Sequence, residues 1–170
     1  MIFKRPISNA LAPNIQKDDV LLAKKLLSGV GQLTMPNGVK VAVKGQRMAL
    51  EAYFCTKFGV NKAFAFNAGR SALLAILRAL SLPLGSQIAV QAFTCNAVIN
   101  PIIKAGYRPV YIDIDDDLNL DVSKLKQKLG EVRGIIVQHT FGMPAKIKEI
   151  CALAKEKNIF VIEDCAHALG

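Results

Sequence analysis

Two patterns of hydrophobic positions alternate along the chain from residue 45 onward. Short, unbroken apolar runs such as Ile135-Ile136-Val137 are typical of strands buried on both faces of a sheet. Between these runs, apolar residues recur with the period of a helix. The order predicts strands at residues 62–66, 87–90, 109–114, 134–137 and 159–162, and helices at residues 45–58, 71–80, 96–105, 122–129 and 145–157. This alternation predicts an α/β fold with a mainly parallel sheet flanked by helices.

The first 44 residues follow a different pattern. Pro6 and Pro13 interrupt regular structure near the start, and residues 17–27 have a helical pattern that begins with acidic residues. Residues 28–40 contain glycines and a proline and are predicted to form a loop. We therefore expect an N-terminal arm and helix at residues 1–44, followed by one domain at residues 45–170.

The composition is apolar for a soluble protein, with 52% hydrophobic residues among 170. No apolar run approaches the roughly 20 residues that a membrane helix needs, so we expect no membrane-spanning segment. The N-terminus lacks the apolar core of a secretion signal, which predicts a cytoplasmic protein. The apolar excess then indicates surface that a further domain or a second subunit covers.

The net charge of +9 does not by itself indicate nucleic-acid binding. The lysines are scattered at spacings that suit the solvent-exposed faces of helices, and no basic run is interleaved with aromatic residues. We therefore expect no nucleic-acid partner.

Neither the cysteines nor the acidic residues predict a metal site. The four cysteines form no CxxC pair, and Cys55 and Cys151 lie in apolar helical patterns that predict buried thiols. The aspartates at residues 113–117 either bind a divalent metal or form a turn before a short strand, and we favour the turn. Asp113 is the one of them expected to face a site.

Candidate functional residues lie directly after the predicted strands, because ligands of parallel sheets bind beyond the carboxyl ends of the strands. Gly69, Arg70 and Ser71 begin a helix whose free N–H groups either bind an anion or are capped by Ser71. Phe93 and Cys95 follow the next strand, where an aromatic ring either stacks on a planar ligand or belongs to the core.

Glu163 and Asp164 directly follow the last predicted strand, residues 159–162. A carboxylate at the end of a buried strand is costly without a cationic partner, and no lysine or arginine lies nearby in the sequence. Asp164 therefore either meets a ligand that carries a protonated ring nitrogen or accepts hydrogen bonds from local backbone N–H groups. His139 follows another buried strand and is either structural or functional.

Taken in order, three stretches resemble the DegT/DnrJ/EryC1/StrS family. They are "LEAYFCTKFGVNKAFAFNAGRSALLAIL", "AFTCNAVINPIIKAGYRPVYIDID" and "VQHTFGMPAKIKEICALAKEKNIFVIEDCAHALG". The resemblance covers residues 51–170, and its most specific part is HxxGxPA followed by an apolar strand and EDxAHAxG. The family comprises aminotransferases with the aspartate aminotransferase fold that use pyridoxal phosphate (PLP) and act mostly on nucleotide-linked keto-sugars.

The resemblance implies cofactor-binding roles for seven residues. Asp164 would pair with the pyridinium nitrogen, and His167 would hydrogen-bond the phenolic oxygen of the ring. The turn at Gly69, Arg70 and Ser71 would cradle the phosphate through backbone N–H groups. Either Phe93 or Cys95 would contact the ring face.

The resemblance also implies features outside these 170 residues. The lysine that forms the Schiff base with the cofactor is expected beyond Gly170, so no catalytic residue is assigned within the chain. The 170-residue chain alone is expected to be inactive, as a partial large domain that lacks this lysine and the small C-terminal domain. The longer protein would be a homodimer that transfers an amino group, from an amino-acid donor such as glutamate, to a nucleotide-linked keto-sugar. A PLP-dependent sugar dehydratase and a non-catalytic regulatory relative remain as alternatives.

Overall fold

The computed structural model describes residues 32–34, 40–42 and 46–168. The chain divides into two compact units, residues 1–65 and residues 66–170. The expected division after residue 44 stays a prediction.

The described part of the first unit consists of two short strands and one helix. They are β1 (Gln32–Thr34), β2 (Lys40–Ala42) and α2 (Gln46–Phe58). β1 and β2 pair antiparallel, so the prediction of a loop across residues 28–40 is wrong at β1. A three-residue strand is too short to reveal a period of two in the sequence. α2 confirms the helix expected at residues 45–58, whereas the helix expected at residues 17–27 lies outside the described residues.

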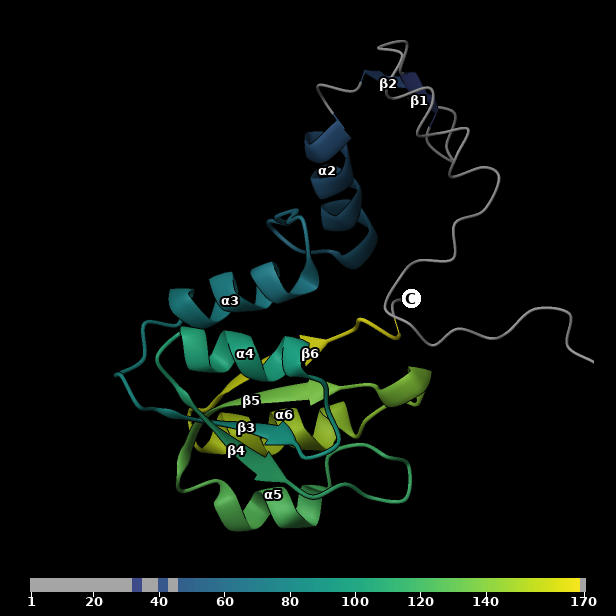
Figure 1. The fold of residues 1–170 in the computed structure, drawn as a ribbon. Coiled ribbons are helices and arrows are strands. Elements are labelled where there is room, and N and C mark those ends of the chain that lie inside the picture. The colour runs from purple at the N-terminus through teal and green to yellow at the C-terminus, as the bar shows by residue number, and fades with distance from the viewer. Residues whose placement is uncertain (1–31, 35–39, 43–45, 169–170) are drawn as a thin grey trace, which may run out of the picture. The chain divides into compact units, whose positions relative to one another are not determined.

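The second unit confirms the predicted α/β fold. A four-stranded sheet, in the order β4-β3-β5-β6, is parallel throughout and is flanked by helices (Figure 1). The strands are β3 (Gln87–Gln91), β4 (Arg108–Ile112), β5 (Val132–Gln138) and β6 (Phe160–Asp164). The helices are α3 (Gly69–Ala79), α4 (Asn96–Lys104), α5 (Val122–Lys128) and α6 (Ile147–Glu156), with a short 3-10 helix η2 (Thr140–Gly142) after β5.

The strand predicted at residues 62–66 is absent. This segment has no regular structure although its residues alternate between alanine and phenylalanine. A strand is stabilised by hydrogen bonds to a neighbouring strand, and no described segment pairs with residues 62–66. Alternation alone is therefore not sufficient to form the strand.

The order of the strands places a topological switch point between β3 and β5. From β3 the chain passes through α4 to β4 on one side, and it then crosses back through α5 to β5 on the other side. Because parallel crossovers are right-handed, this reversal puts α4 and α5 on opposite faces of the sheet. Ligands of such sheets bind in the crevice beyond the carboxyl ends of the strands at the switch point.

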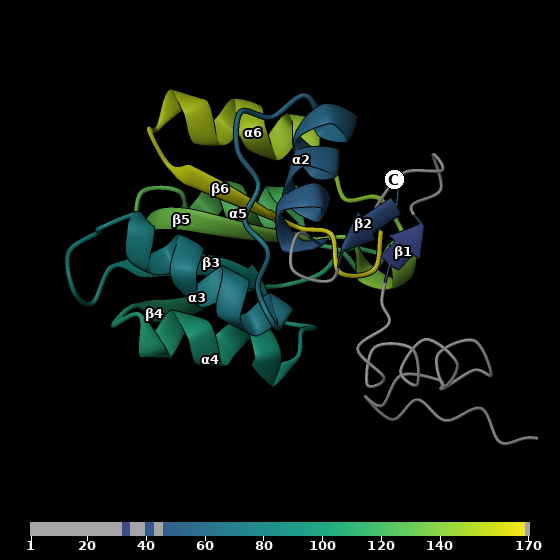
Figure 2. The same ribbon diagram turned by 90° about the horizontal axis from the view of Figure 1, so that it is seen from above.

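Each face of the sheet has its own hydrophobic core. Figure 2 shows the helices that flank the sheet. Ile88, Val90 and Ile136 pack beneath α3 and α4. Ala89 and Ile135, their neighbours along the same strands, pack against α5 and α6 on the other face. Successive residues thus alternate between two buried faces, which explains why the strands are unbroken apolar runs in the sequence.

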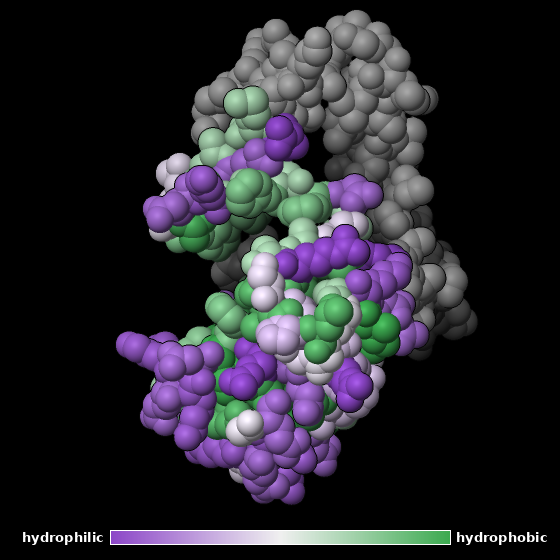
Figure 3. All heavy atoms as spheres, turned by 90° about the vertical axis from the view of Figure 1, so that its left-hand side faces the viewer, coloured by the Kyte–Doolittle hydropathy of each residue, from purple (hydrophilic) through white to green (hydrophobic). Residues whose placement is uncertain are grey.

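The outward faces of α5 and α6 are charged and exposed to solvent. Lys126 on α5 pairs with Glu149 on α6 at 3.0 Å, and both side chains are about half exposed. The lowest part of the molecule in Figure 3, where α5 lies in Figure 1, is hydrophilic. Cys151 is exposed, so its predicted burial is wrong: the buried positions of α6 are Ile150 and Ala154.

No helix among the described residues is long and apolar enough to cross a membrane.

The aspartates at residues 113–117 form a turn, as favoured from the sequence. Asp115 Oδ1 accepts hydrogen bonds from the backbone N–H groups of Asp117 (3.1 Å) and Asn119 (3.3 Å). Asp115 Oδ2 accepts a hydrogen bond from Lys146 Nζ at 2.9 Å, immediately before α6. This carboxylate is therefore occupied by protein donors, and the ion pair joins the turn after β4 to α6.

The ion pair predicts how stability depends on pH. The hydrogen bond from Lys146, opposed in part by burial, holds the pKa of Asp115 below its ordinary value of 3.8. A lowered pKa stabilises the fold above the ordinary pKa, and this contribution is lost as the pH falls through the lowered value. We expect Lys146→Met to lower the urea midpoint at neutral pH and to reduce its loss on acidification. Lys148 is an exposed lysine of α6 with no ion pair among the described residues. Lys148→Met should therefore change neither the urea midpoint at neutral pH nor its loss on acidification. Equal effects of the two variants would contradict the assignment.

Candidate functional site

Asp164 ends β6 on the face of the sheet that α3 and α4 cover. The register places it directly opposite Gln138 at the end of β5. Gln138 Nε2 donates a hydrogen bond to Asp164 Oδ2 at 3.3 Å, and the N–H of Ala166 donates to Oδ1 at 3.2 Å. No lysine or arginine among the described residues forms an ion pair with Asp164. The local N–H contact expected as one alternative is therefore present, and no cation among the described residues compensates the negative charge.

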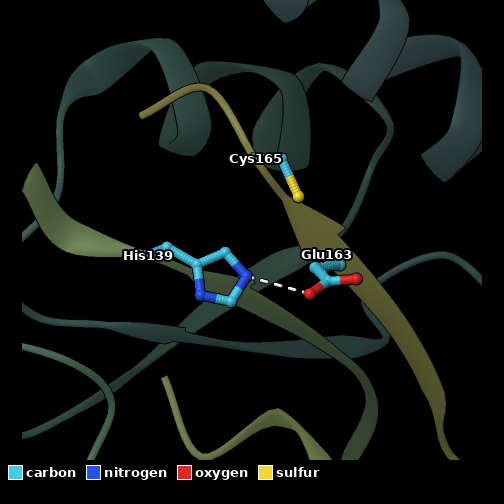
Figure 4. Close-up of side chains that lie close together, drawn as sticks. All are labelled: His139, Glu163 and Cys165. Carbon is cyan, nitrogen blue, oxygen red and sulfur yellow. Dashed lines mark hydrogen bonds and ion pairs between the residues drawn. The ribbon is translucent and has the colours of Figure 1, made fainter. Parts of the chain in front are cut away.

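Glu163 points to the opposite face, where it contacts His139 (Figure 4). His139 Nε2 lies 2.9 Å from Glu163 Oε1, and the buried N–H of Ala145 donates to His139 Nδ1 at 3.0 Å. Since Nδ1 accepts a hydrogen bond, the ring proton is on Nε2 and is donated to the carboxylate. His139 and Glu163 thus have a structural role: they join β6 to the segment that follows β5.

Cys165 lies beside this pair, but the three side chains do not suit a metal ion. Their potential ligand atoms lie within 4.8 Å of one another. Both nitrogens of His139 already take part in hydrogen bonds, so neither has a free lone pair. Burial, with the nearby Glu163 and Asp164 charges, raises the pKa of the Cys165 thiol, whereas metals bind the thiolate.

His167 lies in an aromatic cluster with Phe93 and Phe141. The ring of Phe141 is stacked on the His167 ring with centroids 5.9 Å apart and planes 6° from parallel. Phe93 contacts Phe141 edge-on at 6.1 Å. The N–H of Phe141 donates to His167 Nδ1 at 3.3 Å, so the ring proton of the neutral imidazole is on Nε2. The structure therefore brings together two residues predicted from the sequence and leaves a donor on His167.

The turn that carries Phe141 has an unusual backbone. Phe141 has φ 52° and ψ 23°, a left-handed conformation that is costly for a residue with a side chain. Gly142 follows with φ 89°, and a Cβ at Gly142 would lie 3.4 Å from the carbonyl oxygen of His167. Glycine at this position thus permits the close approach of the two segments.

Gly69, Arg70 and Ser71 form the first turn of α3, at the same edge of the sheet. Ala68 precedes the helix and offers no side-chain cap, so the structure does not support a capping role for Ser71. The N–H of Ser71 donates to the carbonyl oxygen of Ala68 at 3.0 Å, and Arg70 is exposed with no ion pair among the described residues. The N–H of Ser71 is therefore already engaged, and the start of α3 offers an anion the guanidinium of Arg70 and the N–H groups that precede Ser71.

Cys95 is exposed and lies immediately before α4. Its neighbour Thr94 donates a hydrogen bond from Oγ1 to Gln138 Oε1 at 2.6 Å. This bond spans the switch point between β3 and β5. Thr94 and Gln138 were not predicted as site residues, because the sequence does not reveal the register that brings them to Asp164.

Comparison with known proteins identifies the family. The model of the DegT/DnrJ/EryC1/StrS aminotransferase family matches residues 35–170, so the chain belongs to this family. This match confirms the family that the sequence motifs predicted. Family membership indicates pyridoxal phosphate as the cofactor, as predicted.

Three curated relatives show the range of activities. A UDP-N-acetyl-3-dehydro-alpha-D-glucosamine 3-aminotransferase of Acidithiobacillus ferrooxidans is 31% identical, covering 88% of this chain and 40% of its own length. A GDP-perosamine synthase of Escherichia coli O157:H7 is 34% identical over 71% of this chain and 34% of its own length. A dTDP-4-dehydro-2,6-dideoxy-D-glucose 3-dehydratase of Saccharopolyspora spinosa is 31% identical over 78% of this chain and 31% of its own length. The chain thus spans two fifths or less of these relatives.

Solved structures confirm the fold. An aminotransferase from Psychrobacter cryohalolentis matches with a TM-score of 0.75 and 28% identity, covering 93% of this chain and 39% of its own. A GDP-4-keto-6-deoxy-D-mannose-3-dehydratase of Escherichia coli, solved with hydrated PLP, matches with a TM-score of 0.73 and 22% identity, covering 94% of this chain and 41% of its own.

The contacts of His139 predict a cost for its replacement. His139→Leu leaves the buried N–H of Ala145 without an acceptor, which costs about 1–3 kcal/mol. His139→Asn should cost less, because its amide oxygen can take the place of Nδ1. The free energy of unfolding, measured with urea, checks this order. If the asparagine variant is as unstable as the leucine variant, the hydrogen bond from Ala145 is not what makes His139 important.

Proposed function

We propose that this chain is the cofactor-binding part of a PLP-dependent aminotransferase. The enzyme would transfer an amino group, from glutamate, to a nucleotide-linked keto-sugar. The observation that carries the proposal is Asp164, a half-buried carboxylate at the ligand edge of the sheet that has only neutral donors among the described residues. A pyridinium nitrogen would supply the missing positive charge.

The residues at this edge fit pyridoxal phosphate. Asp164 would face the ring nitrogen, and the Nε2–H of His167 would donate to the phenolic oxygen. The start of α3, with Gly69, Arg70 and Ser71, would bind the phosphate. Phe93 or Cys95 would contact the ring face. When bound, the protonated cofactor acts as an electron sink, which is the chemistry an amino transfer requires.

The remaining features of the enzyme are part of the same proposal. None of the described lysines follows a strand at this edge in the context of the family, so we assign the lysine that would hold the cofactor to a part of the protein outside these 170 residues. The full protein would be a cytoplasmic homodimer, and the chain alone would be inactive.

A dehydratase is the second candidate, because one of the relatives is a sugar 3-dehydratase and would need the same cofactor site. An assay of the full-length protein with nitrogen-15-labelled glutamate and keto-sugar nucleotides separates the two. We expect the label to appear in the sugar. A deoxygenated sugar without the label would identify the dehydratase, and no turnover of either kind would contradict both.

Protection of Cys95 provides a direct test of the location of the cofactor. Cys95 and Cys151 are both exposed thiols, but Cys151 lies on α6, which covers the opposite face from α4. We expect PLP to slow alkylation of Cys95 by iodoacetamide severalfold and to leave Cys151 unaffected, as measured by mass spectrometry of peptides. Asp164→Ala should weaken this protection. Equal rates at Cys95 with and without PLP would place the cofactor elsewhere.

A further inference from the structure

We propose that Gln138 is a positioning residue that holds Asp164 in place for the ring nitrogen of the cofactor, and that Thr94 in turn orients Gln138. This inference rests on the proposed function, since it concerns the partner of Asp164. It assigns a role to two residues that have none in the proposed function.

The three side chains form a continuous chain of hydrogen bonds across the carboxyl ends of β3, β5 and β6. Thr94 Oγ1 lies 2.6 Å from Gln138 Oε1, and Gln138 Nε2 lies 3.3 Å from Asp164 Oδ2. Gln138 and Asp164 are register partners on paired strands, so their side chains leave the sheet side by side on one face. The chain of bonds spans the switch point between β3 and β5.

The direction of every bond in this chain is determined. An ionised carboxylate only accepts hydrogen bonds, so the amide group of Gln138 must turn its NH2 toward Asp164. Its carbonyl oxygen then faces Thr94, and the hydroxyl of Thr94 must donate. A single arrangement therefore satisfies all three groups, and it fixes the side chain of Gln138 although this residue is only half buried.

The arrangement holds the carboxylate from both sides without neutralising it. Gln138 donates to Oδ2, and the N–H of Ala166 donates to Oδ1. Both donors are neutral, so they fix the orientation of the carboxylate and add no positive charge beside it. A lysine or arginine in the place of Gln138 would compensate this charge and weaken the attraction for a pyridinium. An amide is thus the kind of side chain that orients Asp164 and keeps it available.

Two cofactors that differ only at the ring nitrogen test the role of Gln138. PLP and 1-deazapyridoxal 5'-phosphate, in which a carbon replaces this nitrogen, carry the same aldehyde and phosphate. The ratio of their dissociation constants for the full-length protein therefore isolates the interaction with Asp164. We expect Gln138→Leu to weaken the binding of PLP by about tenfold or more, as expected for loss of a hydrogen bond to a charged group, and to leave the binding of the deaza compound nearly unchanged.

Two further variants make the test specific. Thr94→Val keeps the shape of the side chain but removes its hydroxyl, and should reduce the preference for PLP in the same direction by a smaller factor. If Gln138→Leu does not fold, Thr94→Val tests the same inference. Gln127 is an exposed glutamine of α5, so Gln127→Leu is the matched control and should leave both dissociation constants unchanged.

The outcomes distinguish this inference from the proposed function. A preference for PLP that shrinks in Gln138→Leu supports the positioning role. Equal losses for both compounds, or an unchanged preference in Gln138→Leu and Thr94→Val, would overturn it while PLP still binds. If the wild-type protein binds neither compound, the proposed function fails and this inference fails with it.

Discussion

The register between β5 and β6 is the constraint on which the rest of the site depends. It sets Gln138 opposite Asp164 and Val137 opposite Glu163. Because side chains alternate along a strand, the two adjacent acids at the end of β6 leave the sheet on opposite faces. A shift of one residue would turn each acid to the other face, so that Glu163 would take the place of Asp164 opposite Gln138.

This alternation separates a structural side from a chemical side. On the face of α5 and α6, His139 satisfies Glu163 and the buried N–H of Ala145 together. On the face of α3 and α4, Asp164 meets only neutral donors among the described residues. One carboxylate therefore has its partner within the fold, and the other has a charge that an external cation can compensate. A carboxylate without a cation is costly in a partly buried place, and in the proposed function the pyridinium nitrogen of the cofactor is that cation.

The sequence predicts the fold of the second unit well, because each strand buried on both faces is an unbroken apolar run and each helix has one apolar face. It predicts less well where structure depends on distant partners. The segment at residues 62–66 has the alternation of a strand but no described partner, and β1 is too short to recognise. Among the candidate site residues, Asp164 was proposed from its position after a strand and His167 from the resemblance to the family. Glu163, His139, Gln138 and Thr94 acquire their roles only from the pairing of strands that are far apart in the sequence.

The contrast between His139 and His167 shows how surroundings decide what one residue type does. Each imidazole accepts a backbone N–H at Nδ1, so each carries its proton on Nε2. At His139 that proton is donated to Glu163, and the buried ring has no capacity left for a ligand. At His167 the same proton has no acceptor among the described residues, and the ring lies exposed beside Phe141. Identical tautomers therefore make one histidine a fixed link within the fold and the other a free donor at the edge where Asp164 lies.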